Sequence, residues 1–268
     1  MALEQLTLEG LNKVEFAIEL LKTWEPAEGY YFADSGGKDS SVVRDLLIKA
    51  GVRYDGHYCV SPIDPPQIWQ FLKEFHPETQ WDYHARGFWK FVLRKGLPLR
   101  QHRWCCIMIK EAGGKGRLTV VGNRRAESNR RHNQCFVEHR RSQDKIVIGP
   151  ILDFDTSDVW QYIRENEVPY CSLYDEAAKR KGYGEGIFKR LGCILCPFSH
   201  DTERDEKYFP KIIKLWKLAC ERLVDKERAS GYLTARGKPM KYRFTSGEDK
   251  YNWWTKREAA PSLAEKAV

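Results

Sequence analysis

The chain has 268 residues, of which 42% are hydrophobic and 13% aromatic, and this composition suits one large α/β domain with a helical extension. No apolar run approaches the roughly 18 residues of a membrane span, and no basic-then-apolar signal opens the chain, so we expect a cytoplasmic protein without membrane contact. The formal charge of +8 favours an anionic partner, either a nucleotide or a nucleic acid.

The apolar residues predict alternating strands and helices along most of the chain. In the first part of the chain we expect a helix near residues 11–21, a strand at 30–33, a helix that Gly51 ends, a strand at 54–60, and a helix that follows Pro65 and Pro66 and contains residues 68–75. Further along we expect a strand at 81–84, a helix at 88–93, strands at 118–121 and 146–148, a helix from residue 155 or 156, and a long helix at 208–228. This alternation is typical of a Rossmann-like parallel sheet flanked by helices, with ligands at the carboxyl ends of its strands. We therefore expect a nucleotide-binding domain over residues 1–200 and a C-terminal helix with a basic tail over 201–268.

A glycine turn joins the first predicted strand to the helix behind it. Its residues are Ser35, Gly36, Gly37, Lys38, Asp39 and Ser40. The glycines allow a tight turn close to an anion, and the amides and dipole at the helix start would face phosphates. The serine hydroxyls and the lysine charge add donors, while the aspartate could hold a metal or orient a ribose. The spacing is not that of a Walker A loop, and a purely structural turn is the other interpretation.

Four cysteines in two close pairs suggest one metal centre. Cys105 and Cys106 are adjacent, and Cys193 and Cys196 follow far downstream as a Cys-x-x-Cys pair. Four thiolates in a tetrahedral set bind zinc or an iron–sulfur cluster, and the spacing does not choose between them. A redox dithiol and a pair of buried core cysteines remain open alternatives. A disulfide framework is not expected, because the cytosol keeps thiols reduced.

The glycine turn resembles the pyrophosphate (PP) loop of the ATP pyrophosphatase and phosphoadenosine phosphosulfate (PAPS) reductase superfamily, whose fold is adenine nucleotide alpha hydrolase-like. The pattern Cys-Cys followed at long range by Cys-x-x-Cys is similar to the [4Fe-4S] signature of adenylyl-sulfate (APS) reductases and of the DNA phosphorothioation protein C group. This resemblance implies a [4Fe-4S] cluster held by Cys105, Cys106, Cys193 and Cys196. It also implies that Lys110, which completes a Cys-Cys-x-x-x-Lys segment, lies near the cluster or the substrate phosphates. A solvated helix lysine is the other interpretation.

Residues 121–131 form another block that is similar to the family, in the pattern Gly-x-Arg-x-x-Glu-Ser-x-x-Arg. The resemblance implies that Gly122, Arg124, Glu127 and Ser128 bind the nucleotide and that Arg131 acts on its phosphates. A glycine leaving a strand before arginines suits phosphate binding, because guanidinium groups bind phosphate oxygens in pairs. An exposed basic loop is the alternative. Segments around residues 149–160, 173–175 and 191–193 also resemble the family, in the family's order.

The C-terminal cysteine that attacks sulfur in true sulfonucleotide reductases is missing from this chain. The one cysteine in the C-terminal region is Cys220, which lies on an apolar helix face and is expected in the core. Because the PP loop is intact, we expect ATP with Mg²⁺, cleaved to AMP and pyrophosphate, rather than APS or PAPS. The expected catalytic residues are Lys38, Asp39, Arg124 and Arg131, with the loop holding pyrophosphate and an arginine stabilising the α-phosphate. The expected partner is a sulfur donor such as a cysteine desulfurase, or a thiol reductant.

Two other functions remain open. The first is a sulfonucleotide reductase that uses an external thiol or one of Cys59, Cys135 and Cys171. The second is a zinc-stapled nucleic-acid-binding module, in which Trp253 and Trp254 would stack on bases. A nucleic acid could also accept the sulfur, with its backbone bound by an arginine-rich stretch. The arginines of that stretch are Arg124, Arg125, Arg130, Arg131, Arg140 and Arg141.

Overall fold

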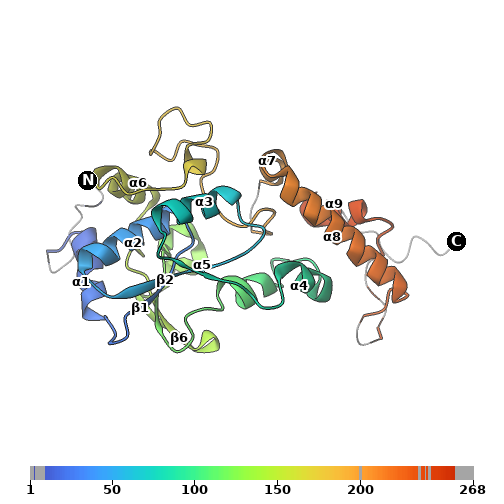
Figure 1. Ribbon diagram of the computed structural model, residues 1–268, viewed down its shortest axis with the longest axis horizontal. Coiled ribbons are helices and arrows are strands. Elements are labelled where there is room, and N and C mark those ends of the chain that lie inside the picture. The colour runs from blue at the N-terminus through green and yellow to red at the C-terminus, as the bar shows by residue number, and fades with distance from the viewer. Residues whose placement is uncertain are drawn as a thin grey trace. The chain divides into compact units, whose positions relative to one another are not determined.

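A six-stranded sheet forms in the described part of the chain (Figure 1). The structure is a computed structural model and describes residues 3, 10–198, 201–234, 237–238, 240 and 243–256. The strands are β1 (Tyr30–Ala33), β2 (Tyr54–Cys59), β3 (Gln80–Asp82), β4 (Leu118–Val120), β5 (Val137–Arg140) and β6 (Lys145–Ile148), in the spatial order β3-β2-β1-β4-β6-β5. Neighbouring strands are parallel except β5 with β6. The Rossmann-like fold class is therefore confirmed, with one antiparallel edge strand that the apolar pattern did not predict.

The chain divides into two compact units, which we call unit 1 and unit 2. Unit 1 consists of Met1–Val60, Asp64–Tyr83 and Met108–Gly192, and unit 2 consists of Ser61–Ile63, His84–Ile107 and Cys193–Val268. The expected domain boundary near residue 200 stays a prediction. Residues 257–268, the end of the expected basic tail, lie outside the described residues.

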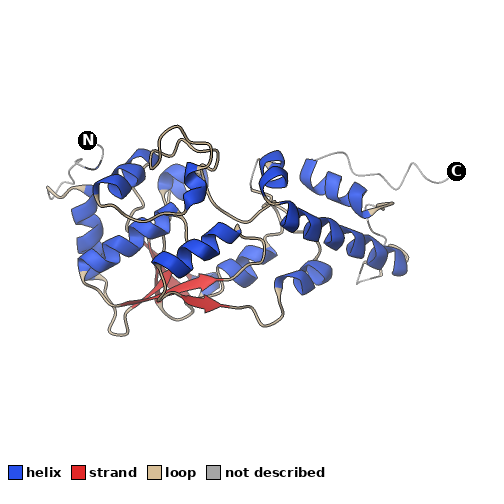
Figure 2. Cartoon of the chain, turned by 45° about the horizontal axis from the view of Figure 1, so that its top comes forward, coloured by secondary structure: helices blue, strands red, loops and turns tan. Residues whose placement is uncertain are grey.

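Unit 1 contains the sheet and the helices that pack on it (Figure 2). These helices are α1 (Lys13–Thr23), α2 (Lys38–Ala50), α3 (Pro66–Phe75), α5 (Asn129–His132) and α6 (Thr156–Glu165), with 3-10 turns η3 (Arg125–Glu127), η4 (Arg141–Gln143) and η5 (Ser172–Asp175). Capping boxes built on Asn12 and Asp155 begin α1 and α6, and Gly51 ends α2 in the left-handed region with φ 69°. Local sequence signals therefore set several helix ends.

The two faces of the sheet differ in chemistry. On one face Tyr30 and Tyr58 are buried, and their hydroxyls make hydrogen bonds to a backbone carbonyl of α1 (2.7 Å) and an indole of α3 (2.9 Å). On the other face His57 lies between two carboxylates, 2.5 Å from Asp55 Oδ2 and 3.0 Å from Asp82 Oδ2. Helices α1 and α3 thus contact the face that carries the two tyrosines, while the polar groups around His57 on the other face are satisfied by one another.

Unit 2 has a helical core rich in aromatic side chains. Its helices are α4 (Phe88–Lys95), α7 (Thr202–Tyr208), α8 (Pro210–Ala229) and α9 (Gly247–Lys256). Trp216 of α8 is fully buried, and its ring centre lies 5.6 Å from that of Phe88 and 4.5 Å from that of Trp254. Cys220 is on the same buried face of α8, which confirms its predicted place in the core. No described helix, α8 included, is both long and apolar enough to cross a membrane.

Candidate functional site

A buried carboxylate holds the glycine turn at the carboxyl end of β1. Asp34, the residue directly after the strand, is 2% exposed. Its oxygens accept hydrogen bonds from Gly36 N (3.0 Å), His76 Nδ1 (2.6 Å) and Thr79 Oγ1 (3.1 Å). These bonds fix the path by which the chain leaves the sheet and enters the turn.

Two glycines allow other segments to approach the turn closely. Gly36 has φ 66°, and a Cβ there would lie 2.7 Å from Ile68 Cγ2 of α3. Gly122, which follows β4, lies against the start of α2. A Cβ on Gly122 would be 3.0 Å from Asp39 C and 3.1 Å from Ser40 N. A side chain at either position would therefore crowd the turn or cover the first amides of α2.

The serine hydroxyls of the turn are bonded within the turn itself. Ser35 Oγ donates to Ser40 Oγ (3.1 Å), and Ser40 Oγ donates to Gly37 O (2.8 Å). Gly37 N in turn donates to Ser35 Oγ (3.4 Å). The side chains of the turn thus stabilise its own conformation. That the serine hydroxyls donate hydrogen bonds to a ligand stays a prediction.

The first turn of α2 has two backbone amides that find no acceptor among the described residues. Lys38 N donates to the hydroxyl of Tyr174 (3.2 Å). The next two amides, those of Asp39 and Ser40, have no such partner. Helix starts leave amides without intrahelical acceptors, and the dipole of this 13-residue helix is positive at the same end. These two amides therefore suit an anion.

A lysine, an aspartate and an arginine form a buried ionic group at the turn. The side chain of Lys38 is 1% exposed, and its Nζ lies 2.8 Å from Asp39 Oδ2. Arg124 Nε lies 2.7 Å from Asp39 Oδ1, and the Arg124 side chain is 4% exposed. Burial lowers the pKa of Lys38, the charge of Asp39 opposes that shift, and the charges of Arg124 and Arg190 add to it. Asp39 thus opposes the loss of the ammonium charge in this poorly hydrated place.

A second carboxylate, that of Glu127, holds two more arginines. Arg131 Nη1 contacts Glu127 Oε2, and Arg190 Nη2 lies 2.8 Å from Glu127 Oε1. Burial, followed by the charges of Arg190 and Arg140, lowers the pKa of Arg131 to about 10. The guanidinium groups around Glu127 therefore repel one another.

The six charged groups form one network with excess positive charge. Arg124 and Arg190 both act on the pKa of Lys38, and Asp39 and Arg124 both act on the pKa of Arg131. The members are Lys38, Arg124, Arg131 and Arg190 as cations and Asp39 and Glu127 as carboxylates, which leaves two positive charges in surplus. Such a surplus next to unsatisfied amides favours a polyanion such as a phosphate chain.

Tyr174 of η5 joins this network to a loop that lies far away in the sequence. Burial raises the pKa of Tyr174, while hydrogen bonds from the backbones of Lys38 and Leu191 oppose that rise. A Cβ on Gly186 would lie 2.1 Å from Tyr174 O, so the loop after η5 passes directly over this residue. One phenol therefore contacts both the start of α2 and the segment that carries Arg190.

The structure brings together five of the residues that the sequence placed at the nucleotide: Lys38, Asp39, Arg124, Glu127 and Arg131. Ser128 is exposed and begins α5, and its contact with a nucleotide stays a prediction. No motif pointed to Asp34, and Tyr174 lies in the 173–175 segment that resembles the family but was given no role there. Arg190 stands directly before the 191–193 segment that resembles the family, and the sequence offered no other signal for it.

Lys110 pairs with a buried carboxylate within unit 1. It is the last residue of the π-helix η2 (Cys106–Lys110) and forms an ion pair with Asp64, whose side chain is 2% exposed. Lys110 Nζ also lies 5.3 Å from the ring centre of Tyr58. The ammonium group of Lys110 is thus paired with a buried carboxylate and lies near an aromatic face, although the side chain is 29% exposed. Its place near a cluster or the substrate phosphates stays a prediction.

Other arginines of the basic stretch are paired with carboxylates of their own. Arg125 contacts Asp153, and Arg140 Nε lies 3.4 Å from Glu138 Oε2. The side chain of Arg130 is outside the described residues. The binding of a nucleic-acid backbone by this stretch stays a prediction.

The four predicted metal ligands are neighbours in unit 2. A hydrogen bond with the Cys106 thiol raises the pKa of Cys105, followed by burial and by the charges of Cys106, Cys193 and Cys196. All four thiols are half-buried. Because charges act on a pKa over short distances, these effects place the other three sulfur atoms close to Cys105.

The Cys-x-x-Cys segment forms a tight turn held by a buried aspartate. Cys196 N donates to Cys193 O (3.1 Å), and Leu195 N donates to Asp205 Oδ2 (2.9 Å). Asp205 is 2% exposed, and Leu195 has φ 56°, a left-handed value that is costly for this residue type. The fold therefore imposes a strained turn at the place where two thiols are presented.

The four thiols are suitable metal ligands by their chemistry, but in this structure they are not arranged around a common metal position. Within the described residues, no group of three or more His, Cys, Asp or Glu side chains is already arranged to hold a metal ion. Thiolates are nevertheless the donors that zinc and iron–sulfur clusters prefer. Metal binding by this set therefore stays a prediction.

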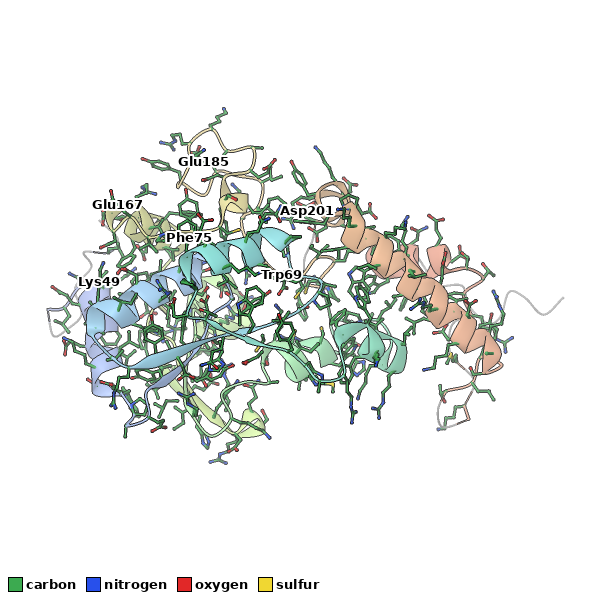
Figure 3. All side chains as sticks on the ribbon, viewed as in Figure 1. Lys49, Trp69, Phe75, Glu167, Glu185 and Asp201 are labelled. Atoms are coloured by element: carbon green, nitrogen blue, oxygen red, sulfur yellow. The ribbon has the colours of Figure 1, made fainter. Side chains whose placement is uncertain are left out.

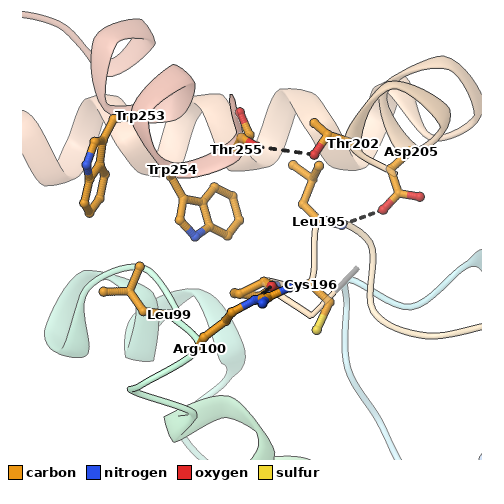
Figure 4. A pocket seen from close by; sticks show the side chains of 10 residues that line it. Leu99, Arg100, Leu195, Cys196, Thr202, Asp205, Trp253, Trp254 and Thr255 are labelled. Carbon is orange, nitrogen blue, oxygen red and sulfur yellow. Dashed lines mark hydrogen bonds between the residues drawn. The ribbon is translucent and has the colours of Figure 1, made fainter. Parts of the chain in front are cut away.

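A pocket of about 300 Å³ lies beside the Cys-x-x-Cys turn in unit 2 (Figure 4). Leu99, Arg100, Trp253 and Trp254 line it together with Cys196. The two tryptophans also pack against aromatic rings of their own unit, with Trp253 5.2 Å from the ring centre of Phe244. Stacking of these tryptophans on bases stays a prediction.

Three of the remaining thiols are poor candidates for a nucleophile, whereas Cys135 is not excluded by burial. Burial raises the pKa of Cys171 to about 11 and that of Cys220 to about 12. Burial also raises the pKa of Cys59. Thiols are weak nucleophiles when protonated, so these three do not suit attack on sulfur at neutral pH. Cys135 is exposed.

Comparison with known proteins gives one family and several distant relatives. Residues 30–199 match the family model described as phosphoadenosine phosphosulfate reductase domain. An uncharacterized protein of Methanocaldococcus jannaschii is 28% identical over 80% of this chain and 52% of its own length. A probable FAD synthase of Caenorhabditis elegans is 28% identical over 68% of this chain and 34% of its own length. An adenosine 5'-phosphosulfate reductase of Neisseria meningitidis is 35% identical over 47% of this chain and 49% of its own length.

The chain spans about half or less of the length of these relatives. The family match begins at β1, includes the glycine turn and both cysteine pairs, and covers more than half of the chain. This chain therefore belongs to the phosphoadenosine phosphosulfate reductase domain family.

Proposed function

We propose that this chain is an enzyme that binds an adenine nucleotide at the turn between β1 and α2. The observation that carries the proposal is the pair of unsatisfied amides, those of Asp39 and Ser40, beside a network with two surplus positive charges. A phosphate chain supplies hydrogen-bond acceptors and negative charge together, whereas a neutral ligand would leave the charge uncompensated. The family, and a relative named as an adenosine 5'-phosphosulfate reductase, support the same class of ligand.

ATP is the nucleotide that we propose, cleaved between its α- and β-phosphates. An acceptor oxygen attacks the α-phosphorus, the bond to the bridging oxygen breaks, and pyrophosphate leaves with the electron pair. The oxygen that now carries the adenylyl group is a good leaving group, and a sulfur nucleophile displaces it as AMP. The support for ATP is the intact Ser-Gly-Gly-Lys-Asp-Ser turn, which offers sites for the departing pyrophosphate.

The charged residues of the network take distinct parts in this proposal. Lys38 and the two amides hold the pyrophosphate, and Arg124 with Arg131 stabilises the charge that develops at the α-phosphate. Asp39 orients Lys38 and Arg124, since each of its oxygens lies within 2.8 Å of one of them. Mg²⁺ arrives with ATP as part of the substrate. Removing one charged donor of this kind typically costs on the order of 3 kcal/mol of transition-state stabilisation.

We propose further that Cys105, Cys106, Cys193 and Cys196 hold a [4Fe-4S] cluster. The support is the proximity of the four half-buried thiols and the softness of thiolate ligands. When bound, such a cluster supplies a redox-active and electrostatic centre, and four cysteine ligands leave no iron open. Asp205 would keep the Cys193–Cys196 turn in shape during loading, because it already accepts from the turn's backbone. Zinc is the alternative metal.

A sulfonucleotide reductase is the second candidate, and the name of the Neisseria relative favours it. This activity would release sulfite from APS or PAPS and would use an external thiol or the exposed Cys135, since burial raises the pKa of Cys59, Cys171 and Cys220. In the leading proposal the partner is instead a sulfur donor such as a cysteine desulfurase, and the acceptor could be a nucleic acid.

One anaerobic preparation tests both candidates. The protein is assayed in parallel with ATP, APS and PAPS, and AMP, pyrophosphate and sulfite are measured. We expect AMP and pyrophosphate from ATP, together with a brown protein that contains iron. Sulfite from APS or PAPS, with no product from ATP, would replace the leading proposal by the second candidate. If the protein binds none of the three nucleotides, both candidate functions are wrong.

A further inference from the structure

Arg190 differs from the other cations of the network in its exposure. Its side chain is 61% exposed, whereas those of Lys38 and Arg124 are 1% and 4% exposed. Among the residues that the structure describes, its ion-pair partner is Glu127, whose side chain is 6% exposed. A buried carboxylate thus holds a guanidinium group that remains largely in water and is free to change partners.

Glu127 can release Arg190 without becoming an unpaired buried charge. Arg131 contacts Oε2 of the same carboxylate, while Arg190 lies 2.8 Å from Oε1. Losing both partners would leave a buried carboxylate uncompensated, which is strongly destabilising. Losing Arg190 alone leaves the pair between Arg131 and Glu127 intact, so this exchange of partners need not destabilise the folded state.

Arg190 is also close to the place where phosphates would bind. Its charge lowers the pKa of Lys38 and that of Arg131, which are both members of the network around the turn. The backbone of the next residue, Leu191, hydrogen-bonds to Tyr174, and the same phenol accepts from Lys38 N. The segment that carries Arg190 is therefore tied to the first residue of α2.

We propose that Arg190 binds the nucleotide directly. In the bound state its guanidinium group gives up its ion pair with Glu127 and forms a charge-assisted hydrogen bond with a phosphate group held at the turn. This inference rests on the proposed function, because it needs a phosphate-bearing ligand at the start of α2. It assigns to the chain a further binding residue, outside the glycine turn and the 121–131 block. Relief of the repulsion among the guanidinium groups favours the exchange.

The test is the affinity of Arg190→Gln for ATP and for inorganic pyrophosphate, measured by calorimetry at low and high salt. A hydrogen bond between charged groups contributes about 1.5–3 kcal/mol, so we expect both ligands to bind roughly 10- to 100-fold more weakly. The salt dependence of binding should also become shallower, because one cation no longer acts on the anion. Arg190→Lys should recover part of the affinity, since it restores the charge without the planar fork.

Arg180→Gln is the matched control. Arg180 is 63% exposed and pairs with Glu185, which lies in the same loop after η5 (Figure 3). We expect this variant to bind both ligands as the unsubstituted chain does. If Arg190→Gln binds ATP and pyrophosphate with unchanged affinity and salt dependence, the inference is wrong while the proposed function stands. If the unsubstituted chain binds neither ligand, the proposed function itself fails.

Discussion

The glycine turn of unit 1 and the cysteine segments of unit 2 differ in how far each is prepared for its ligand. Asp34 and Tyr174 hold the turn through hydrogen bonds of 2.6 to 3.2 Å, and two amides already lack an acceptor there. In unit 2 the thiols are neighbours, yet within the described residues they do not form a ready metal site.

This difference follows from the chemistry of the two donor sets. Amides and arginines can be fixed by the chain's own hydrogen bonds and ion pairs, so an anion site can exist before the anion arrives. Thiolates repel one another, and the metal itself supplies the energy that closes such a site. The anion site should therefore tolerate the loss of one member, whereas the metal site should depend on every ligand.

Removing one thiol should have the largest effect. We expect Cys193→Ser to lose essentially all bound metal, because a four-thiolate site with one ligand missing rarely holds its cluster. Iron and zinc content after anaerobic purification measures this loss. Cys135→Ser is the control, since Cys135 is exposed and stands apart from the four predicted ligands in the sequence. Full metal content in Cys193→Ser would remove this cysteine from the ligand set.

Removing the buried charge of the turn should have the next largest effect. Lys38→Met keeps the volume of a side chain that is 1% exposed, and Asp39 keeps its pair with Arg124. We expect kcat/KM for nucleotide cleavage to fall roughly 100- to 1,000-fold. Lys49→Met, on the same helix and paired with Asp45, should leave kcat/KM unchanged. A fall of similar size in both variants would point to damage of α2 rather than loss of a phosphate ligand.

Raising the pH should weaken nucleotide binding more gently. Arg131 has a lowered pKa of about 10, so its guanidinium is charged below that pH and becomes neutral as pH rises through it. We expect affinity for ATP, whose phosphates are already ionised, to fall roughly tenfold across this range. A bound anion favours the charged form and moves the midpoint upward. Arg131→Gln should bind more weakly at neutral pH and show a flatter profile; an identical alkaline fall in that variant would assign the titration to another group.

Removing one hydroxyl should have the smallest effect. Tyr174→Phe deletes the acceptor of Lys38 N, which costs about 1 kcal/mol, and we expect nucleotide affinity to fall roughly fivefold. Tyr162→Phe is matched to it, because its buried hydroxyl also bonds to α2, at Asp45 Oδ2 (2.6 Å). Thermal unfolding should show similar losses of stability for both variants, with weaker binding in Tyr174→Phe alone. Equal affinities in the two variants would leave Tyr174 a purely structural residue.

The sequence predicted those elements whose signals are local. The apolar run of β1, the glycine turn and the periodic face of α2 stand next to one another in the chain, so the turn could be placed between them. The strand β5 escaped because Val137–Arg140 is an edge strand with one apolar residue and no buried face to impose alternation. The roles of Tyr174 and Arg190 at the site were not predicted. Their contacts with Lys38 and Glu127 join segments far apart in the sequence, and such contacts leave no periodic pattern.

The excess of positive charge around Glu127 also affects the stability of the protein without a ligand. Repulsion among guanidinium groups lowers the free energy of unfolding, so the residues that make binding possible also make the ligand-free protein less stable. A ligand that neutralises them binds the folded state alone and should raise the melting temperature. A thermal-shift screen of phosphorylated metabolites would thus rank candidate substrates before any assay of turnover exists.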